Sequence, residues 1–272
     1  MRLWAISDLH LASDANRQAL LQMPNHGDDW LIIAGDIGEK LEHLQFALAH
    51  LTKMFAKVIW VPGNHDLWAV PEHQGAQPLV GQAKYNALVD CARSFNVLTP
   101  EDDYAIFPGT NIVLVPLFLL YDYSLRPAYV TLAKVIDWAR AERSVCADET
   151  FLDPTPHASR VEWCANRLAY SLTRLKKLIP GSQTVLINHW PLRNDLINIP
   201  RIPRFTPWCG TVETEDWHQQ FNAKVVVSGH LHTRRTDWRN GTRFEEVSLG
   251  YPRQWDTDRG MTLYLRQIWP EV

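Results

Sequence analysis

Aspartate, asparagine and histidine recur in this sequence in five short groups whose residue types suit metal binding. Mixed oxygen and nitrogen donors without thiolate favour Mn, Fe or Zn over Ca. Such an ion lowers the pKa of bound water toward about 7 and so supplies a nucleophile at neutral pH. The groups therefore predict metal-assisted hydrolysis if they converge in space. They are Asp8-x-His10, Gly35-Asp36, Gly63-Asn64-His65-Asp66, His189 and Gly229-His230-x-His232.

Each group follows a short apolar run that predicts a strand. The runs are rich in Val, Ile and Leu and are mostly continuous, which is typical of strands buried on both faces. Ligands of α/β sheets bind at the carboxyl ends of the strands, so we expect the five groups to share one edge. The runs are Arg2–Ser7, Trp30–Ala34, Lys57–Val61, Thr184–Asn188 and Lys224–Ser228.

Helices are predicted between these strands, and further strands toward the C-terminus. Apolar spacing indicates helices over Leu41–Phe55, Leu79–Phe95 and Ala158–Leu178. Strands are expected at Asn111–Leu117, Thr233–Trp238, Arg243–Ser248 and Met261–Gln267, with a hairpin turn at Asn240-Gly241. We predict a single domain over residues 1–272, with a helical cap or insertion within about 67–180.

The bulk composition fits a globular cytoplasmic enzyme. The 272 residues are 46% hydrophobic, and the formal net charge of −3 argues against a nucleic-acid-binding protein. The four cysteines form no C-x-x-C pair, which favours free thiols in a reducing compartment. The N-terminus has no room for a secretory signal, and the longest apolar run, Ile112–Leu120, is too short to span a bilayer.

In this order, the five groups resemble the calcineurin-like metallophosphoesterase family. The resemblance extends from residue 8 to residue 232 and implies a two-sheet α/β sandwich with α-β-β-α layers. It also implies two metal ions, Mn or Fe in the first place and Zn as an alternative, with a bridging hydroxide that attacks phosphorus. Asp8, His10, Asp36 and His232 would hold one ion, and Asp36, Asn64, His189 and His230 the other.

The resemblance gives His65 a role outside metal binding. In the family pattern, this histidine stands over the leaving-group oxygen and donates a proton or stabilises charge, and Asp66 would orient its ring. Glu39 stands where purple acid phosphatases carry an iron-binding tyrosine, so the chain departs from that subgroup. From the sequence, Glu39 is either a supporting residue or a surface residue at a helix start.

The segment after His189 is rich in proline and arginine and directs attention to the substrate. Guanidinium groups match phosphate geometry, so Arg193, Arg201, Arg204 and Arg253 are candidate substrate-binding residues. This part of the chain resembles a bacterial subgroup that includes phosphopantetheinyl hydrolases, which remove 4′-phosphopantetheine from acyl carrier proteins. Carrier proteins are acidic, so a local arginine-rich loop would favour docking.

Three other functions remain open at this point. A cyclic-nucleotide or other small-molecule phosphodiesterase would need no protein-docking surface. A nuclease would need a larger basic field, and salt-sensitive DNA binding would indicate one. A non-catalytic scaffold, such as the retromer subunit that keeps this fold, would have lost ligand residues, whereas every expected ligand and His65 are present here.

We predict that His65→Ala binds both metal ions but loses about 10²–10⁴-fold in turnover, the usual contribution of a positioned general acid. Metal content and steady-state rates test this. Wild-type turnover in a fully metal-loaded variant would contradict the role.

Overall fold

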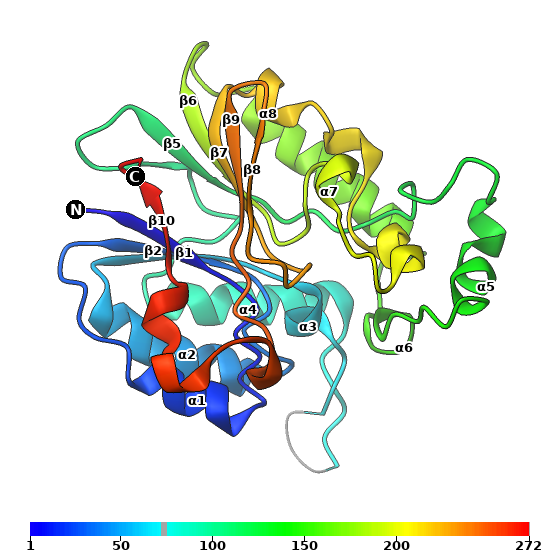
Figure 1. The fold of residues 1–272 in the computed structure, drawn as a ribbon, viewed down its shortest axis with the longest axis horizontal. Coiled ribbons are helices and arrows are strands. Elements are labelled where there is room, and N and C mark those ends of the chain that lie inside the picture. The colour runs from blue at the N-terminus through cyan, green and yellow to red at the C-terminus, as the bar shows by residue number, and fades with distance from the viewer. Residues whose placement is uncertain (72–74, 272) are drawn as a thin grey trace.

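Two β-sheets lie face to face in the computed structural model, which describes residues 1–71 and 75–271 (Figure 1). The first has the order β10-β1-β2-β3 and the second the order β4-β5-β6-β7-β9-β8. The strands of the first are β1 (Leu3–Ile6), β2 (Trp30–Ala34), β3 (Lys57–Val61) and β10 (Arg266–Trp269). Those of the second are β4 (Ala105–Ile106), β5 (Ile112–Pro116), β6 (Gln183–Ile187), β7 (Ala223–Ser228), β8 (Thr236–Arg239) and β9 (Thr242–Glu246).

The inner strands are parallel, as their continuous apolar sequences predict. β1, β2 and β3 pair in parallel, as do β5, β6, β7 and β9, whereas β10, β4 and β8 add antiparallel edges. The predicted hairpin is confirmed, since Asn240 and Gly241 join β8 to β9 with φ angles of 53° and 79°. Positive φ at both turn residues matches the twist of the flanking strands.

The predicted strand at Met261–Gln267 is wrong over most of its length. A 3₁₀ segment occupies Met261–Tyr264, and β10 begins only at Arg266. Met261 and Leu265 are buried in the core cluster that contains Leu20 of a neighbouring helix, whereas Leu263 is exposed. The apolar side chains thus recur with helical spacing rather than with the alternation of a strand.

Helices cover both outer faces of the sheet pair. They are α1 (Asp14–Leu21), α2 (Leu41–Met54), α3 (Asn64–Leu67), α4 (Gly81–Ser94), α5 (Val135–Arg140), α6 (Asp148–Phe151), α7 (Arg160–Leu175) and α8 (Trp217–Gln220). In β2, Leu31 and Ile33 pack in the core on the helical side, whereas Ile32 joins the core between the sheets. In β6, Leu186 instead packs outward with Leu175 of α7. This alternation gives the expected α-β-β-α layers.

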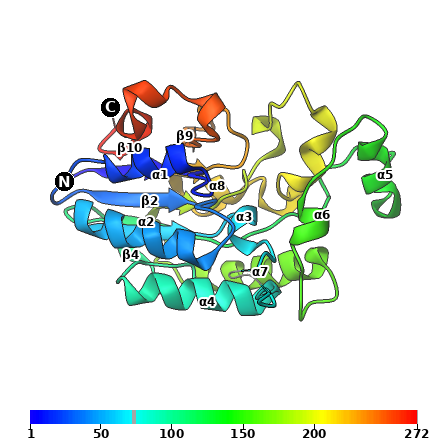
Figure 2. The same cartoon turned by 90° about the horizontal axis from the view of Figure 1, so that it is seen from below.

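Only part of the interval 67–180 lies outside the layers. Helices α4 and α7 flank the sheets, whereas α5 and α6 project beyond them in both views (Figure 1, Figure 2). We call residues 118–159, which contain α5 and α6, the cap. Among the described residues, no helix has the length and apolar character needed to cross a bilayer.

We expect Ile59→Ala to lower the free energy of unfolding by about 2–5 kcal/mol, because Ile59 is fully buried between the sheets. The control is Ile179→Ala, whose parent side chain is 78% exposed and whose effect should stay within about 0.5 kcal/mol. Urea unfolding of both variants measures the difference. Equal losses would mean that the inter-sheet core is not what holds the layers together.

Candidate metal centre

The seven residues expected to bind metal lie at the carboxyl ends of five parallel strands. Asp8 and His10 follow β1, Asp36 follows β2 and Asn64 follows β3, so four of the seven come from the first sheet. The other three come from the second sheet: His189 follows β6, and His230 and His232 follow β7. The facing sheets bring both sets to one edge.

The backbone at this edge adopts conformations that non-glycine residues rarely take. A residue with a side chain costs about 1–3 kcal/mol in such a conformation, and functional sites concentrate these residues. Five of the seven expected ligands have a left-handed φ: Asp8 (54°), His10 (43°), Asp36 (55°), His230 (73°) and His232 (54°). The unusual backbone conformation of these loops therefore determines the direction of the five side chains.

Gly63 and Gly229 make room for neighbouring carboxylates and are not required by a positive φ angle. A Cβ on Gly63 would collide with the Asp36 side chain, and a Cβ on Gly229 would collide with that of Asp8. Neither glycine has a positive φ. A side chain at either position would displace a carboxylate of the cluster.

Asp8, His10 and His232 form the first group of converging donors. The Nε2 of His232 lies 2.9 Å from Asp8 Oδ1 and 3.2 Å from His10 Nε2. The other oxygen of Asp8 accepts hydrogen bonds from the Ser7 and Ser248 hydroxyls and the His230 N–H. One carboxylate oxygen is thus anchored while the other faces the group.

Asp36, Asn64, His189 and His230 form the second group. His189 Nε2 and His230 Nδ1 each lie 3.2 Å from the Asn64 amide oxygen, and His189 Nε2 lies 3.5 Å from Asp36 Oδ2. Asp36 also meets His10 and His65 in a cluster compatible with a metal ion, and meets Asp8 and His189 in another. Its position between the two groups is the one a bridging carboxylate would need.

Hydrogen bonds on the far side of two rings fix which nitrogen faces the centre. His189 Nδ1 donates to the carbonyl oxygen of Ala34 (2.8 Å), and His232 Nδ1 donates to Gln254 Oε1 (2.8 Å). Because these partners only accept, Nδ1 is the donor in each ring, and the neutral ring would offer its Nε2 lone pair to a metal ion at the centre. This is the arrangement that orients metal-binding histidines.

The electrostatics of the cluster fit bound cations. Burial, together with nearby Asp8 and Asp66, raises the pKa of Asp36 well above its usual value. Burial would also raise the pKa of Asp8, but its histidine neighbours, His232 first, lower it well below the usual value. Burial lowers the pKa of His10 and His230, so both rings are neutral and can act as ligands. His230 Nε2 and His10 Nδ1 are buried without a hydrogen-bond partner in the described structure.

His65 is oriented by Glu39 and not by Asp66, which corrects the expected role of Asp66. The His65 Nδ1 lies 3.2 Å from Glu39 Oε1. The carboxylate of Asp66 instead accepts from the backbone N–H groups of Asp36, Ile37, Gly38 and Gly63 at 2.8–3.2 Å. Asp66 therefore holds the loop that carries Asp36. Burial would raise the pKa of Glu39, but its hydrogen bond to His65 helps to lower it to about 2.

Two of the four candidate substrate arginines are occupied by protein partners. Arg193 donates to Asp195 Oδ1 (2.9 Å) and to the carbonyl oxygen of Glu215 (2.8 Å). This pairing argues against the expected contact between Arg193 and substrate. Arg204 donates to the carbonyl oxygen of Trp138 and to Glu142 Oε1 (3.0 Å), so it ties its loop to the cap.

The remaining two arginines are exposed. Arg253 lies over the ring of Tyr251, 5.4 Å from its centroid, and that ring stacks on His10 at 4.2 Å. Arg253 therefore stands at the rim of the centre, separated from it by one aromatic ring. Arg201 lies in the proline-rich loop, and no contact with the centre is present for its side chain in the described structure.

Aromatic rings and one cap residue complete the surroundings of the centre. The Trp68 ring packs on His65 (3.6 Å between centroids), and Phe205 stacks on His230 (6.0 Å). The fully buried carboxylate of Asp148 in α6 accepts a hydrogen bond from Asn64. Sequence reasoning missed Asp148, because no motif surrounds it and it lies 84 residues from Asn64.

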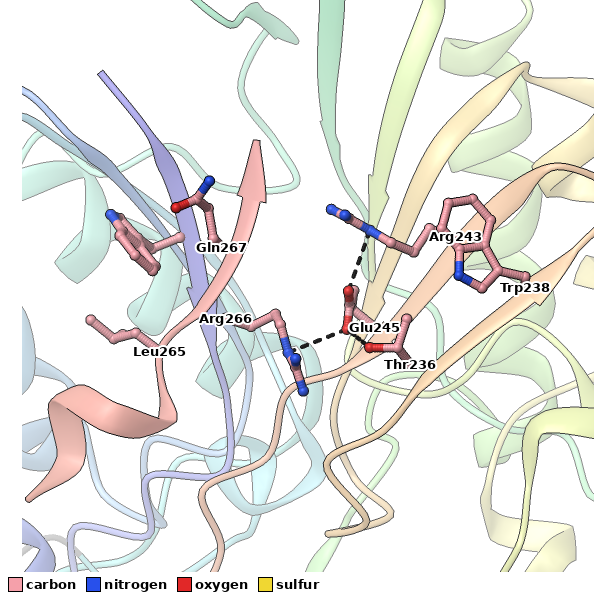
Figure 3. A pocket seen from close by; sticks show the side chains of 8 residues that line it. Thr236, Trp238, Arg243, Glu245, Leu265, Arg266 and Gln267 are labelled. Atoms are coloured by element: carbon pink, nitrogen blue, oxygen red, sulfur yellow. Dashed lines mark hydrogen bonds and ion pairs between the residues drawn. The ribbon is translucent and has the colours of Figure 1, made fainter. Parts of the chain in front are cut away.

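A separate cavity of about 490 Å³ lies between β10 and the β8–β9 hairpin (Figure 3). Its charged groups pair with one another: Glu245 lies 3.3 Å from both Arg243 and Arg266 and accepts a hydrogen bond from Thr236. None of the seven expected ligands lines this cavity. It is a polar seam between the two sheets, distinct from the centre.

The layered fold and the cluster at its edge define a metal-dependent phosphoesterase. The chain belongs to the calcineurin-like phosphoesterase family, whose model matches residues 1–234 and whose members use a dinuclear metal centre. The acyl-carrier-protein phosphodiesterase PptH of Mycobacterium tuberculosis is 41% identical over 273 residues, which cover 99% of this chain and 83% of that protein.

One solved structure agrees closely with this assignment. The crystal structure of phosphopantetheinyl hydrolase (PptH) from Mycobacterium tuberculosis matches with a TM-score of 0.93 and 40% identity, over 99% of this chain and 96% of that one. A dimetal phosphatase from Danio rerio matches with a TM-score of 0.47 and 14% identity, over 95% and 90% of the two chains.

We expect Glu39→Gln to reduce kcat about tenfold, a fraction of what a general acid contributes, with KM and metal content unchanged. The amide keeps the shape of Glu39 but not its charge, so the contact that orients the His65 ring through Nδ1 is weaker. Glu42→Gln, at a neighbouring exposed site, is the control. A wild-type kcat in Glu39→Gln would show that Glu39 takes no part in the reaction.

Proposed function

We propose that this chain hydrolyses the phosphodiester that links 4′-phosphopantetheine to the serine of an acyl carrier protein. The observation that carries the proposal is the convergence of seven oxygen and nitrogen donors from both sheets at one edge, five of them buried and two half-buried. The similarity to PptH along 99% of the chain supports this choice of substrate.

Within this proposal, the two groups of donors hold two ions. Asp8, His10, Asp36 and His232 hold one, and Asp36, Asn64, His189 and His230 hold the other, with Asp36 shared. The donor set contains carboxylate, amide and imidazole but no thiolate, which favours Mn or Fe, with Zn as an alternative. When bound, two such ions supply Lewis acidity toward the phosphoryl oxygens and lower the pKa of water.

The side chains around the ions complete the reaction. Glu39 accepts the Nδ1 proton of His65, so a protonated ring directs its Nε2–H toward the centre, where Asp36 Oδ2 lies 4.0 Å away. His65 then gives this proton to the serine oxygen as its bond to phosphorus breaks. Water contributes the oxygen added to phosphorus, so the products are the free serine and 4′-phosphopantetheine.

The surface beside the centre offers room for the pantetheine arm. A cavity of about 520 Å³ lies between the cap and the segment Pro203–Trp208, lined by Leu125, Arg126, Pro127, Trp138, Asn194, Pro203, Arg204 and Thr206. Phe205 of the same segment stacks on His230. We propose that the arm extends along this segment from the centre into the cavity. Arg253 and Arg201 would face the acidic carrier protein.

We propose that the reaction takes place in the cytoplasm. The four cysteines are buried free thiols, as a reducing compartment would leave them.

Metal-loaded protein should remove the pantetheine arm from holo acyl carrier protein. Intact-mass measurement of the carrier protein follows the loss directly, and aryl mono- and diesters are tested in parallel. Asp36→Asn should abolish the reaction and lower the content of both ions, because it weakens a ligand that both share.

Two results would contradict the proposal. Rapid hydrolysis of aryl diesters with an intact carrier protein would identify a small-molecule phosphodiesterase. A protein that binds no metal and hydrolyses no ester in Mn²⁺ buffer would be a scaffold.

A further inference from the structure

We infer that Asp148, a residue of the cap, is a positioning residue for metal binding: it sets the orientation of the Asn64 amide. This inference rests on the proposed assignment of Asn64 as a ligand of the second ion. It makes the cap a part of the metal centre.

Asp148 contacts two residues of the segment that carries the centre. Its Oδ1 accepts hydrogen bonds from Asn64 Nδ2 (2.9 Å) and from the Trp68 indole N–H (2.7 Å). The residue is fully buried, and its Oδ2 has no hydrogen-bond partner in the described structure. A carboxylate held in a dry site in this way makes strong, charge-assisted hydrogen bonds.

The chemistry of the two side chains dictates which end of the amide faces the centre. An asparagine amide has a donor NH₂ end and an acceptor oxygen end, and a carboxylate only accepts. Asp148 therefore binds the NH₂ end and leaves Asn64 Oδ1 pointing at His189 Nε2 and His230 Nδ1, each 3.2 Å away. A flipped amide would present N–H groups to a cation and could not bind it.

The indole of Trp68 links the same carboxylate to His65. The Trp68 ring packs on His65 with 3.6 Å between centroids, while its N–H is held by Asp148. One buried oxygen thus fixes a ligand of the second ion and the ring that supports the proposed general acid.

The neighbouring residue Glu149 provides a matched control within α6. Its carboxylate accepts from Trp208, Tyr123 and Arg160, and in the described structure it makes no hydrogen bond with Asn64. Removing the charge of Glu149 should weaken these contacts of the cap and leave the hydrogen bond between Asp148 and Asn64 in place. Asp148→Asn and Glu149→Gln therefore separate positioning from general support of the cap.

The experiment titrates metal-free full-length protein with Mn²⁺ alone and follows affinity and stoichiometry. Electron paramagnetic resonance distinguishes a coupled pair of ions from an isolated ion. Wild-type protein should bind two ions. Asp148→Asn should bind one ion normally and the second about tenfold or more weakly, the usual effect of losing a residue that orients a ligand. Glu149→Gln should bind both ions as wild type does.

A reversal of polarity tests the orientation itself. In Asn64→Asp/Asp148→Asn, the new amide donates to the new carboxylate, so an oxygen again faces the second ion. This double variant should recover the second ion relative to Asp148→Asn alone, a result that simple loss of packing would not give.

Three outcomes would overturn the inference: two ions bound to Asp148→Asn with wild-type affinity, equal loss in Glu149→Gln, or no recovery in the double variant. Each can occur while the wild type still binds two ions and hydrolyses its substrate. A wild-type protein that binds no pair of ions would instead refute the proposed function.

Discussion

The burial of several carboxylates at one point is the constraint on which the rest of this structure depends. Asp8, Asp36 and Asp66 lie together away from water, so burial disfavours the ionised form of each, and the charges of Asp8 and Asp66 add to this for Asp36. The chain offsets this with donors from its own loops: Asp66 accepts four backbone N–H groups, and Asp36 accepts the N–H of His65. Bound cations would complete the compensation, which links metal binding to the stability of the fold.

Both sheets contribute donors to the candidate metal centre. The first sheet supplies the carboxylates, the amide and His10, and the second supplies His189, His230 and His232, so each of the two groups of donors draws on both sheets. The apolar core between the sheets sets the distance between the two halves. Its packing is therefore a functional requirement, because a displacement of about 1 Å at a reacting centre can cost 10²-fold in rate.

The sequence predicts where this centre lies, because the location of the strand ends follows from the order of the strands. Polar residues that end buried parallel strands of one sheet must share one edge. This rule places Asp8, Asp36 and Asn64 at one edge of the first sheet and His189 and His230 at one edge of the second. It does not determine where a loop side chain points. Asp66 was expected to face the ring of His65, but its carboxylate binds the backbone around Asp36. The apolar pattern of Met261–Gln267 also led to a wrong prediction, because so short a segment fits both the alternation of a strand and the spacing of a helix.

Residues that adapt the centre to a substrate lie in segments with no periodic pattern, and for this reason the sequence identifies them poorly. Arg193 sits two residues before Asp195 and pairs with it, a contact that only the loop conformation reveals. Adjacent residues of α6 connect both sides of the centre: Asp148 holds Asn64, and Glu149 holds Trp208 at the end of the segment that carries Phe205. The same short helix therefore contacts both the segment of Asn64 and the segment of Phe205, through two separate carboxylates. Because the two contacts use different side chains, each can be changed without removing the other.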